Sequence, residues 1–185
     1  MIFSKRKQNQ EEKYLIVGLG NPEPEYSNTR HNMGFDVINK LSEKYNIKVN
    51  KSRFKSIYGV GTIENKNVIL CKPQTYMNLS GDAIELISKF YKVSNDHIIV
   101  VYDDIDIQTG TIKIRKKGGP GTHNGMKSIV HSLHSEEFFR VRIGTGFCDN
   151  KEKLIDYVIK KVSNEEYERL QNGINSATDA VADRK

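Results

Sequence analysis

Short runs of apolar residues alternate along this chain with segments in which apolar residues recur every three or four positions. Residues 15–17 and 98–102 are continuous apolar runs rich in β-branched side chains, which is typical of strands in a sheet covered on both faces. Further strands are predicted where side chains alternate or a run stops at turn residues, at residues 56–63, 68–72, 110–115 and 140–143. A short polar turn joins the first two of these and predicts a hairpin.

The spacing of apolar residues predicts an amphipathic helix over residues 32–45 and another that starts near Asn78, a residue type that often caps a helix N-terminus. A third helix carries Met126 in its apolar stripe, and two more helices close the chain. Alternating strands and helices predict an α/β fold, with a mixed, largely parallel β-sheet covered by helices on both faces. We expect this single domain to span residues 13–185, after a polar N-terminal extension at residues 1–12.

Composition narrows the class of protein. The chain has 185 residues and a net charge of +6, which suits a phosphate-rich partner. Two cysteines are too few for a disulfide framework or a four-cysteine zinc site, so we expect free thiols in a reducing, cytoplasmic setting. The longest apolar runs are too short to cross a bilayer, and the N-terminus lacks the apolar segment of a secretory signal. We therefore expect neither a membrane protein nor a secreted one.

A glycine-rich segment, Gly-Leu-Gly-Asn-Pro-Glu, follows the first strand at residues 18–23. A dinucleotide-binding loop has the pattern G-x-G-x-x-G and opens directly into a helix. Here Glu23 occupies the third glycine position and would repel a pyrophosphate, while Pro22 and Pro24 remove amide donors. We therefore expect a tight turn that requires glycine, and no nucleotide site.

His31 lies at the start of the first predicted helix, in the segment Arg30-His31-Asn32. A single histidine in such a place is commonly a solvated or capping residue. It can also be a general base, because a helix N-terminus disfavours the imidazolium and leaves the ring ready to accept a proton. A base of this kind needs a partner, often a carboxylate, that fixes its tautomer.

Asp103 is a candidate for that partner because it directly follows a buried strand, where an unpaired charge is costly. Two other interpretations remain open: an aspartate-rich turn, or a metal site formed with Asp104 and Asp106. Adjacent residues of a strand point to opposite faces, so Asp103 and Asp104 are poorly placed to chelate one ion.

Three asparagines, Asn21, Asn78 and Asn124, fall at junctions between predicted strands and helices, where the site of an α/β fold is built. An amide donates and accepts hydrogen bonds without titrating, which suits contact with a peptide backbone, a water or an oxyanion. Asn78 and Asn124 could equally be helix caps.

Basic residues gather in sequence around a glycine-rich loop at residues 118–121. Strand alternation places Lys113 with Arg115, and Arg140 with Arg142, on shared faces. Such charges often form only a solvated surface, but this pattern is also typical of a phosphate-binding patch, whose affinity falls as salt rises.

Five segments in this order and spacing resemble the bacterial-type peptidyl-tRNA hydrolase family. They are Gly-Leu-Gly-Asn-Pro-x-x-x-Tyr-x-x-Thr-Arg-His-Asn at 18–32, Tyr-Met-Asn-Leu-Ser-Gly at 76–81, Asp-Asp-Ile-Asp at 103–106, Gly-Thr-His-Asn-Gly-Met-Lys-Ser-Ile at 121–129 and Phe-Arg-Val-Arg-Ile-Gly at 139–144. The resemblance runs from about residue 14 to the end of the chain.

The resemblance implies an enzyme that hydrolyses the ester bond between an N-blocked peptide and the 3′ end of tRNA, and so recycles peptidyl-tRNA released prematurely from ribosomes. It implies no metal or organic cofactor, and we expect a monomer. His31 would be the base that activates water, Asp103 would orient it, and Asn21 would position the water or stabilise the oxyanion. The implied substrate-binding residues are Tyr26 near the tRNA 3′ end, Met77, Asn78 and Asn124 around the peptide and the tRNA terminus, and Lys113 and Arg115 on tRNA phosphate.

The alternative is a catalytically silent RNA-binding protein on the same fold. A pure binder has no need of a base and its carboxylate partner, so the presence of His31 and Asp103 favours the enzyme.

Overall fold

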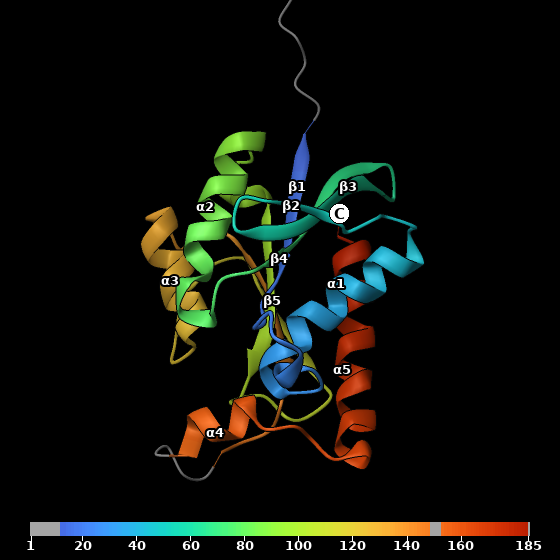
Figure 1. Ribbon diagram of the computed structural model, residues 1–185, viewed down its shortest axis with the longest axis vertical. Helices are drawn as coiled ribbons and strands as arrows, with labels where there is room; N and C mark the ends of the chain where they lie inside the picture. The colour runs from blue at the N-terminus through green and yellow to red at the C-terminus, as the bar shows by residue number, and fades with distance from the viewer. Residues whose placement is uncertain (1–11, 149–152, 185) are drawn as a thin grey trace, which may run out of the picture.

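The structure is a computed structural model, and it describes residues 12–148 and 153–184 (Figure 1). Of the predicted N-terminal extension only Glu12 lies within these residues. In chain order the strands and α-helices are β1 (Lys13–Gly18), α1 (Met33–Lys44), β2 (Lys51–Arg53), β3 (Ser56–Ile63), β4 (Lys66–Pro73), α2 (Ser80–Tyr91), β5 (Ile98–Asp104), β6 (Ile112–Arg115), α3 (Asn124–Leu133), β7 (Phe139–Gly144), α4 (Leu154–Ile159) and α5 (Asn164–Ala182).

Seven strands form one sheet in the order β2-β3-β4-β1-β5-β7-β6. The four central strands, β4, β1, β5 and β7, are parallel, whereas β3 and β6 run antiparallel to their neighbours. The predicted hairpin is β3 and β4, whose turn residues Glu64 and Asn65 both have positive φ, as a tight two-residue hairpin turn requires. The mixed, largely parallel sheet predicted from the sequence is confirmed.

Both faces of the central strands are buried, which is why these strands have no polar alternation. Ile16 and Ile99 belong to one apolar cluster with residues of α1 and α5, whereas their neighbours Leu15 and Val100 belong to a second cluster with residues of α2 and α3. Successive side chains of a strand point to opposite faces, so each continuous apolar run supplies both cores.

The helices form a layer on each side of the sheet, with α2 and α3 on one face and α1 and α5 on the other (Figure 1). The short helix α4 lies apart from these layers, at one end of the molecule (Figure 1). Among the helices of residues 12–148 and 153–184, none is long and apolar enough to cross a bilayer.

The glycines after the first strand serve a purpose other than the predicted tight turn. Neither Gly18 nor Gly20 has positive φ, so no left-handed turn demands them. A Cβ on Gly18 would lie 2.0 Å from the carbonyl oxygen of Gly34, and one on Gly34 would lie 2.3 Å from the amide nitrogen of Leu19. Glycine is required here because α1 packs directly on the backbone of β1, and this contact sets the position of the turn that carries His31.

The two asparagines considered as caps do not cap helices. Helix α2 begins at Ser80, after a 3₁₀ turn at Met77–Leu79 that contains Asn78, and it has no side-chain cap. Helix α3 begins at Asn124 itself, and its cap is His123, whose Nδ1 accepts a hydrogen bond from the amide of Met126. Neither Asn78 nor Asn124 therefore caps the helix that follows it, although Oδ1 of Asn124 accepts from Nζ of Lys127 at 3.5 Å.

Candidate active site

A cavity of about 480 Å³ opens at the carboxyl end of the central strands. Its walls come from the loop after β1, the 3₁₀ turn before α2, the end of β5, the glycine-rich loop and α4. The predicted site residues that line it are Asn21, His31, Met77, Asn78, Asp103, Arg115 and Asn124. The cavity thus lies at the strand ends, where the fold class predicts a site.

Tyr26 and Lys113 are the predicted site residues outside this lining. Tyr26 is half-buried in a 3₁₀ turn at Pro24–Tyr26 and lies close enough to Tyr76, a lining residue, that an ionised Tyr26 would raise the pKa of Tyr76. Lys113 is exposed on β6, two residues before Arg115 on the same face of the strand. Both residues therefore lie near the cavity's margin rather than inside it.

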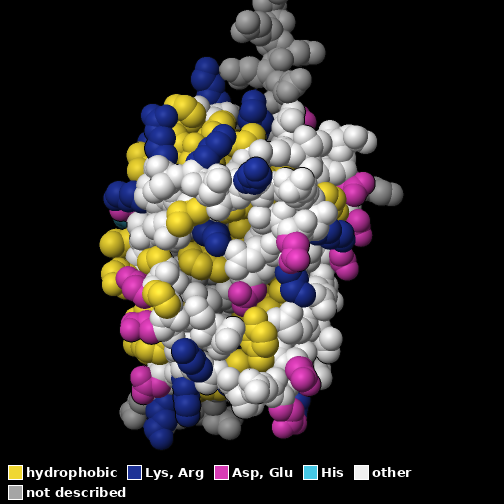
Figure 2. All heavy atoms as spheres, turned by 45° about the vertical axis from the view of Figure 1, so that its right-hand side comes forward, with side chains coloured by type: hydrophobic (Ala, Val, Ile, Leu, Met, Phe, Trp, Pro, Cys, Tyr) yellow, Lys and Arg dark blue, Asp and Glu magenta, His cyan; other side chains and the backbone are white. Residues whose placement is uncertain are grey.

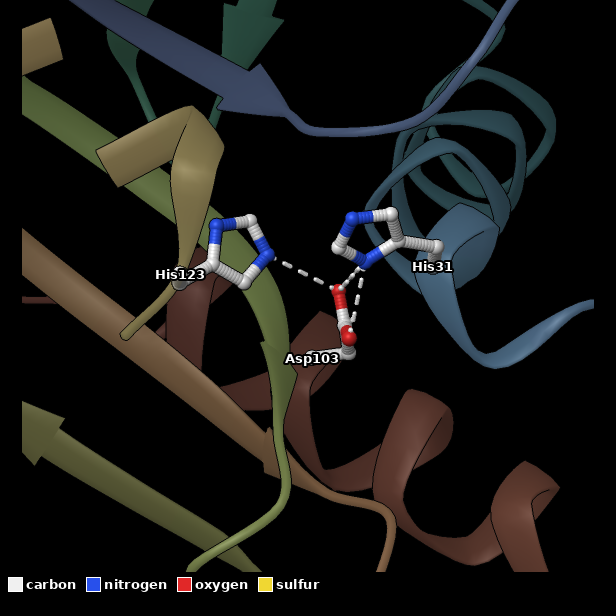
Figure 3. A group of neighbouring side chains, drawn as sticks. All are labelled: His31, Asp103 and His123. Atoms are coloured by element: carbon white, nitrogen blue, oxygen red, sulfur yellow. Dashed lines mark hydrogen bonds and ion pairs between the residues drawn. The ribbon is translucent and has the colours of Figure 1, made fainter. Parts of the chain in front are cut away.

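His31 and Asp103 meet at the floor of the site (Figure 3). Nδ1 of His31 lies 2.9 Å from Oδ1 and 3.0 Å from Oδ2 of Asp103. An ionised carboxylate only accepts hydrogen bonds, so Nδ1 carries the proton and donates it. Nε2, on the far side of the ring, is left with a free lone pair. This is the tautomer that a general base for water requires.

His123 is a second imidazole on the same carboxylate, and no sequence pattern predicted a role for it. Its Nε2 lies 3.0 Å from Oδ1 of Asp103, and its ring centroid is 4.9 Å from that of His31 (Figure 3). Because Nδ1 accepts from the Met126 amide, the proton of the neutral ring sits on Nε2, which donates to Asp103. The sequence signal for this contact is the position of His123 directly before α3. A histidine that caps a helix through one ring nitrogen has the other nitrogen free to bind a second group.

The charges of this cluster shift its pKa values. Burial by itself would lower the pKa of His31, but the negative charge of Asp103 and the hydrogen bond to it raise that pKa above 6.5. Burial would raise the pKa of Asp103, yet the two imidazoles hold it well below 3.8. Asp103 is therefore ionised at neutral pH, although its residue is only 2% exposed.

Asn21 is oriented by contacts on three sides. Its Oδ1 accepts from the amide of Met77 at 2.9 Å, so its Nδ2 is the group left to face the cavity. Its backbone N–H donates to Oδ1 of Asn32, and its carbonyl accepts from Nδ2 of Asn32. The side-chain amide of Asn32 thus satisfies both backbone hydrogen-bonding groups of Asn21. This pair of bonds joins the loop after β1 to the turn that contains His31.

Of the other candidate binding residues, Asn78 and Asn124 are exposed and line the cavity, whereas Met77 is buried. The amide oxygen of Asn124 accepts from Nζ of Lys127 at 3.5 Å. Met77 presents an apolar surface next to Asn21.

The basic residues of β6 and β7 do not form the uniform patch that their alternation predicts. Lys113 pairs with Arg142, and Arg115 with Arg140, in the register of the two strands. Arg140 is only 2% exposed, and its guanidinium donates to the carbonyls of Glu136, Phe138 and Gly118. It therefore holds the glycine-rich loop instead of offering its charge to a phosphate.

Arg142 is likewise committed, because its Nε lies 2.6 Å from Oδ2 of Asp104. The charges of Lys113 and Arg115 remain, and neither forms an ion pair with any residue that the structure describes. Of these four cations on β6 and β7, Lys113 and Arg115 are therefore the two whose charges have no ionic partner among the described residues.

Within residues 12–148 and 153–184, one group has the composition of a metal site, and it is the cluster of His31, Asp103 and His123. In this cluster two imidazole N–H groups face one carboxylate at hydrogen-bond distances, so the donors and acceptor satisfy one another. A cation there would have to displace both protons. The alternative metal site of Asp103, Asp104 and Asp106 is not formed, since Asp103 contacts two histidines and Asp104 contacts Arg142.

An α/β fold with a carboxylate-oriented imidazole, the oriented amide of Asn21 and the cation Arg115 at one cavity has the groups that hydrolysis of an ester requires. A family model described as peptidyl-tRNA hydrolase matches residues 15–184. Among curated relatives, the peptidyl-tRNA hydrolases of Clostridium botulinum (strain Alaska E43 / Type E3) and Clostridium perfringens (strain ATCC 13124) are each 51% identical. The alignments cover 91% of this chain in both cases, and 87% and 89% of the relatives.

Among solved structures, peptidyl-tRNA hydrolase from Acinetobacter baumannii superposes with a TM-score of 0.87 at 39% identity, over 91% of this chain and 86% of that one. The chain belongs to the peptidyl-tRNA hydrolase family. Membership supports peptidyl-tRNA hydrolysis, as the sequence motifs predicted, and does not favour the alternative of a catalytically silent RNA-binding protein.

Proposed function

We propose that this chain hydrolyses the ester bond between a peptide and the 3′ end of tRNA, with His31 as the general base. The observation that carries the proposal is the double contact of His31 Nδ1 with Asp103, which leaves Nε2 free at the cavity. Family membership supports the substrate, and we infer that the enzyme acts as a cytoplasmic monomer on peptidyl-tRNA released from ribosomes.

The first chemical step uses the tautomer that Asp103 fixes. Nε2 of His31 takes a proton from a water molecule as its oxygen attacks the ester carbonyl. Asp103 stabilises the imidazolium that forms, and His123, through its own bond to Asp103, holds the carboxylate in place. Nδ2 of Asn21 can donate a hydrogen bond to the carbonyl oxygen as that oxygen becomes an oxyanion.

Collapse of the tetrahedral intermediate breaks the bond between the carbonyl carbon and the ribose oxygen. The imidazolium returns its proton to that oxygen, so the products are a free peptide carboxylic acid and tRNA with an intact 3′ hydroxyl. No redox or metal step is needed for this balance.

Substrate binding would use residues in and beside the cavity. Asn78 and Asn124 would hydrogen-bond the peptide backbone and the tRNA terminus, with Met77 as an apolar surface of the pocket. Lys113 and Arg115 would hold tRNA phosphate, and Tyr26 would lie near the 3′ end. The family resemblance implies these roles, and the presence of Met77, Asn78, Arg115 and Asn124 in the cavity lining supports them.

The test is hydrolysis of N-acetyl-aminoacyl-tRNA beside unblocked aminoacyl-tRNA, in EDTA, by the wild type and His31→Ala. We expect rapid cleavage of the blocked substrate only, and a loss of about 10²–10⁴-fold in His31→Ala with tRNA affinity retained. His131→Ala, which removes an exposed histidine of α3, is the matched control and should behave as the wild type. Salt-sensitive tRNA binding without cleavage by any of these proteins would make the chain an RNA-binding module instead.

A further inference from the structure

Arg30, the residue before the proposed base, is buried and joins three parts of the chain. It lies with His31 in the 3₁₀ turn Arg30–Asn32 and is only 7% exposed. Its Nη1 donates to the carbonyl of Tyr157 at 2.8 Å, and its guanidinium stacks 3.8 Å from the centroid of the Tyr157 ring. Its Nη2 forms an ion pair with Glu166. One side chain therefore links the turn of His31 to α4 and to α5.

Helix α4, which Arg30 contacts, forms the apolar wall of the cavity through Leu154, Ile155, Val158 and Ile159. It has only six residues, and a helix of that length is not stable without tertiary contacts. Its place against the cavity must therefore be set by what it packs on.

The contacts that hold α4 converge on the turn of His31. Arg30 binds the carbonyl and the ring of Tyr157, whose hydroxyl donates to the carbonyl of Thr145 at 2.8 Å. Just after α4, Thr29 forms a β-bridge with Lys161, and the amide of Val162 donates to the carbonyl of Asn28. Arg30 is the side chain through which the helix itself, rather than the segment after it, reaches this turn.

We propose that Arg30 is a positioning residue for the hydrolysis, which holds the apolar wall of α4 in a fixed place relative to His31. Substrate held against α4 then meets Nε2 of His31 at a reactive distance. The proposal rests on the proposed function, because it requires His31 to be the base. Arginine suits this task because a planar guanidinium stacks on a ring while it donates in two directions, which lysine does not do.

The experiment compares the wild type with Arg30→Lys, Glu166→Gln and Tyr157→Phe, at a temperature where each variant is shown to be folded. Arg30→Lys keeps the positive charge but loses the planar guanidinium that stacks on Tyr157. Glu166→Gln keeps an acceptor oxygen for Arg30 but loses the negative charge. Tyr157→Phe keeps the aromatic ring but loses the hydrogen bond to the carbonyl of Thr145. The matched control is Arg169→Lys, which alters the exposed ion pair with Glu165 on α5.

In Arg30→Lys we expect kcat/KM for N-acetyl-aminoacyl-tRNA to fall by about 10–100-fold, because a small misplacement of substrate against the base is costly. The fall should be the same at every pH, with the rising limb of the pH profile in its wild-type place, since the charge that acts on His31 is that of Asp103. The methyl NMR signals of Val158 and Ile159 should shift in Arg30→Lys and stay unchanged in Arg169→Lys. Glu166→Gln and Tyr157→Phe should give smaller losses in the same direction.

Two results would overturn the proposal. One is wild-type kcat and KM in folded Arg30→Lys, and the other is a loss of activity that only follows the fraction of unfolded protein, with the methyl signals of the folded part unmoved. Failure of the proposed function would look different, because the wild type would then not cleave the substrate, or His31→Ala would cleave it normally.

Discussion

Asp103 accepts hydrogen bonds from two imidazoles at once, and a neutral amide cannot replace it. Both imidazoles contact Oδ1 of Asp103, and Oδ2 also lies 3.0 Å from Nδ1 of His31. In Asp103→Asn an NH2 group replaces one of these two acceptor oxygens and so faces an imidazole N–H. The negative charge that raises the pKa of His31 would also be lost. Both the orientation and the basicity of His31 therefore depend on this carboxylate.

We predict two changes in the pH profile of Asp103→Asn. The active form of His31 is neutral, so kcat/KM of the wild type should rise with pH and level off above a pKa that exceeds 6.5. In Asp103→Asn this limb should move to lower pH, and the plateau should fall by about 10²–10⁴-fold. Asp104→Asn removes the neighbouring carboxylate, which contacts Arg142, and should leave the limb in place. If the rising part of the pH profile of Asp103→Asn stayed at the wild-type pH, Asp103 would not control the pKa of the catalytic base.

His123 has two functions that substitutions can separate, because each ring nitrogen has its own partner. Asparagine at position 123 can still cap α3 but does not reach Asp103 as the imidazole does, whereas alanine loses both contacts. We expect both variants to lose about 10–100-fold in kcat/KM, the value of one hydrogen bond to a charged group. Only His123→Ala should also lose the cap, so it should be less stable than His123→Asn by about 0.5–2 kcal/mol in urea unfolding. If His123→Asn were fully active, the cap alone would matter for the reaction.

At the scale of elements, strands β6 and β7 show how one charge pattern divides into two roles. Arg140 on the parallel strand is enclosed by carbonyls and holds the glycine-rich loop, and Arg142 beside it pairs with Asp104. On the edge strand β6, Lys113 and Arg115 remain exposed. An edge strand is where a long anionic partner can approach, so the phosphate-binding function is expected to lie on β6 alone.

We predict that Lys113→Ala and Arg115→Ala each weaken tRNA binding and each reduce the slope of log K against log salt by about 1. Lys89→Ala, which removes an exposed lysine of α2 that pairs with Glu85, is the control and should keep the slope. The slope is measured from tRNA affinities determined by fluorescence anisotropy at several salt concentrations. A slope that stays the same in both β6 variants would remove them from the phosphate contacts.

For the whole molecule, sequence patterns predicted the features that depend on the spacing of residues close together in the chain, namely the strands and helices. The apolar runs at residues 15–17 and 98–102 fixed the two buried central strands, and the strand ends then located the cavity. What the patterns could not predict depends on contacts distant in sequence. The burial of Arg140 and the contact of His123 with Asp103 both arise where separate segments converge, and neither leaves a periodic signal.

The glycines of the first loop show the same limit. Gly18 was expected to serve a turn, but it is needed because α1 approaches the strand backbone. Such an approach depends on where a helix returns in space, which the local sequence does not state. Family motifs supplied the residues of the site, and the structure shows which of them touch.

The stability of the whole chain should respond to Asp36, a half-buried carboxyl of α1 outside the site. Burial raises its pKa from 3.8 to about 6, against the opposing charges of Lys72 and Lys40. Its Oδ2 has no hydrogen-bond partner among the residues that the structure describes. Because the folded state binds this proton more tightly than the unfolded state, ionised Asp36 opposes folding. The cost is full above pH 6, decreases between pH 6 and 3.8, and is absent below pH 3.8.

We therefore predict that Asp36→Asn raises the free energy of unfolding at pH 7, by at most about 3 kcal/mol for this difference in pKa. At pH 3.5, below 3.8, the variant and the wild type should be equally stable by urea unfolding, because Asp36 is then neutral in both states. Glu43→Gln, which removes an exposed carboxyl from the same helix, is the matched control and should change little at either pH. Equal stabilities of Asp36→Asn and the wild type at pH 7 would mean that Lys72 and Lys40 offset the burial of the charge completely. If Asp36→Asn were less stable than the wild type at pH 7, the ionised carboxyl would stabilise α1, in whose first turn it lies.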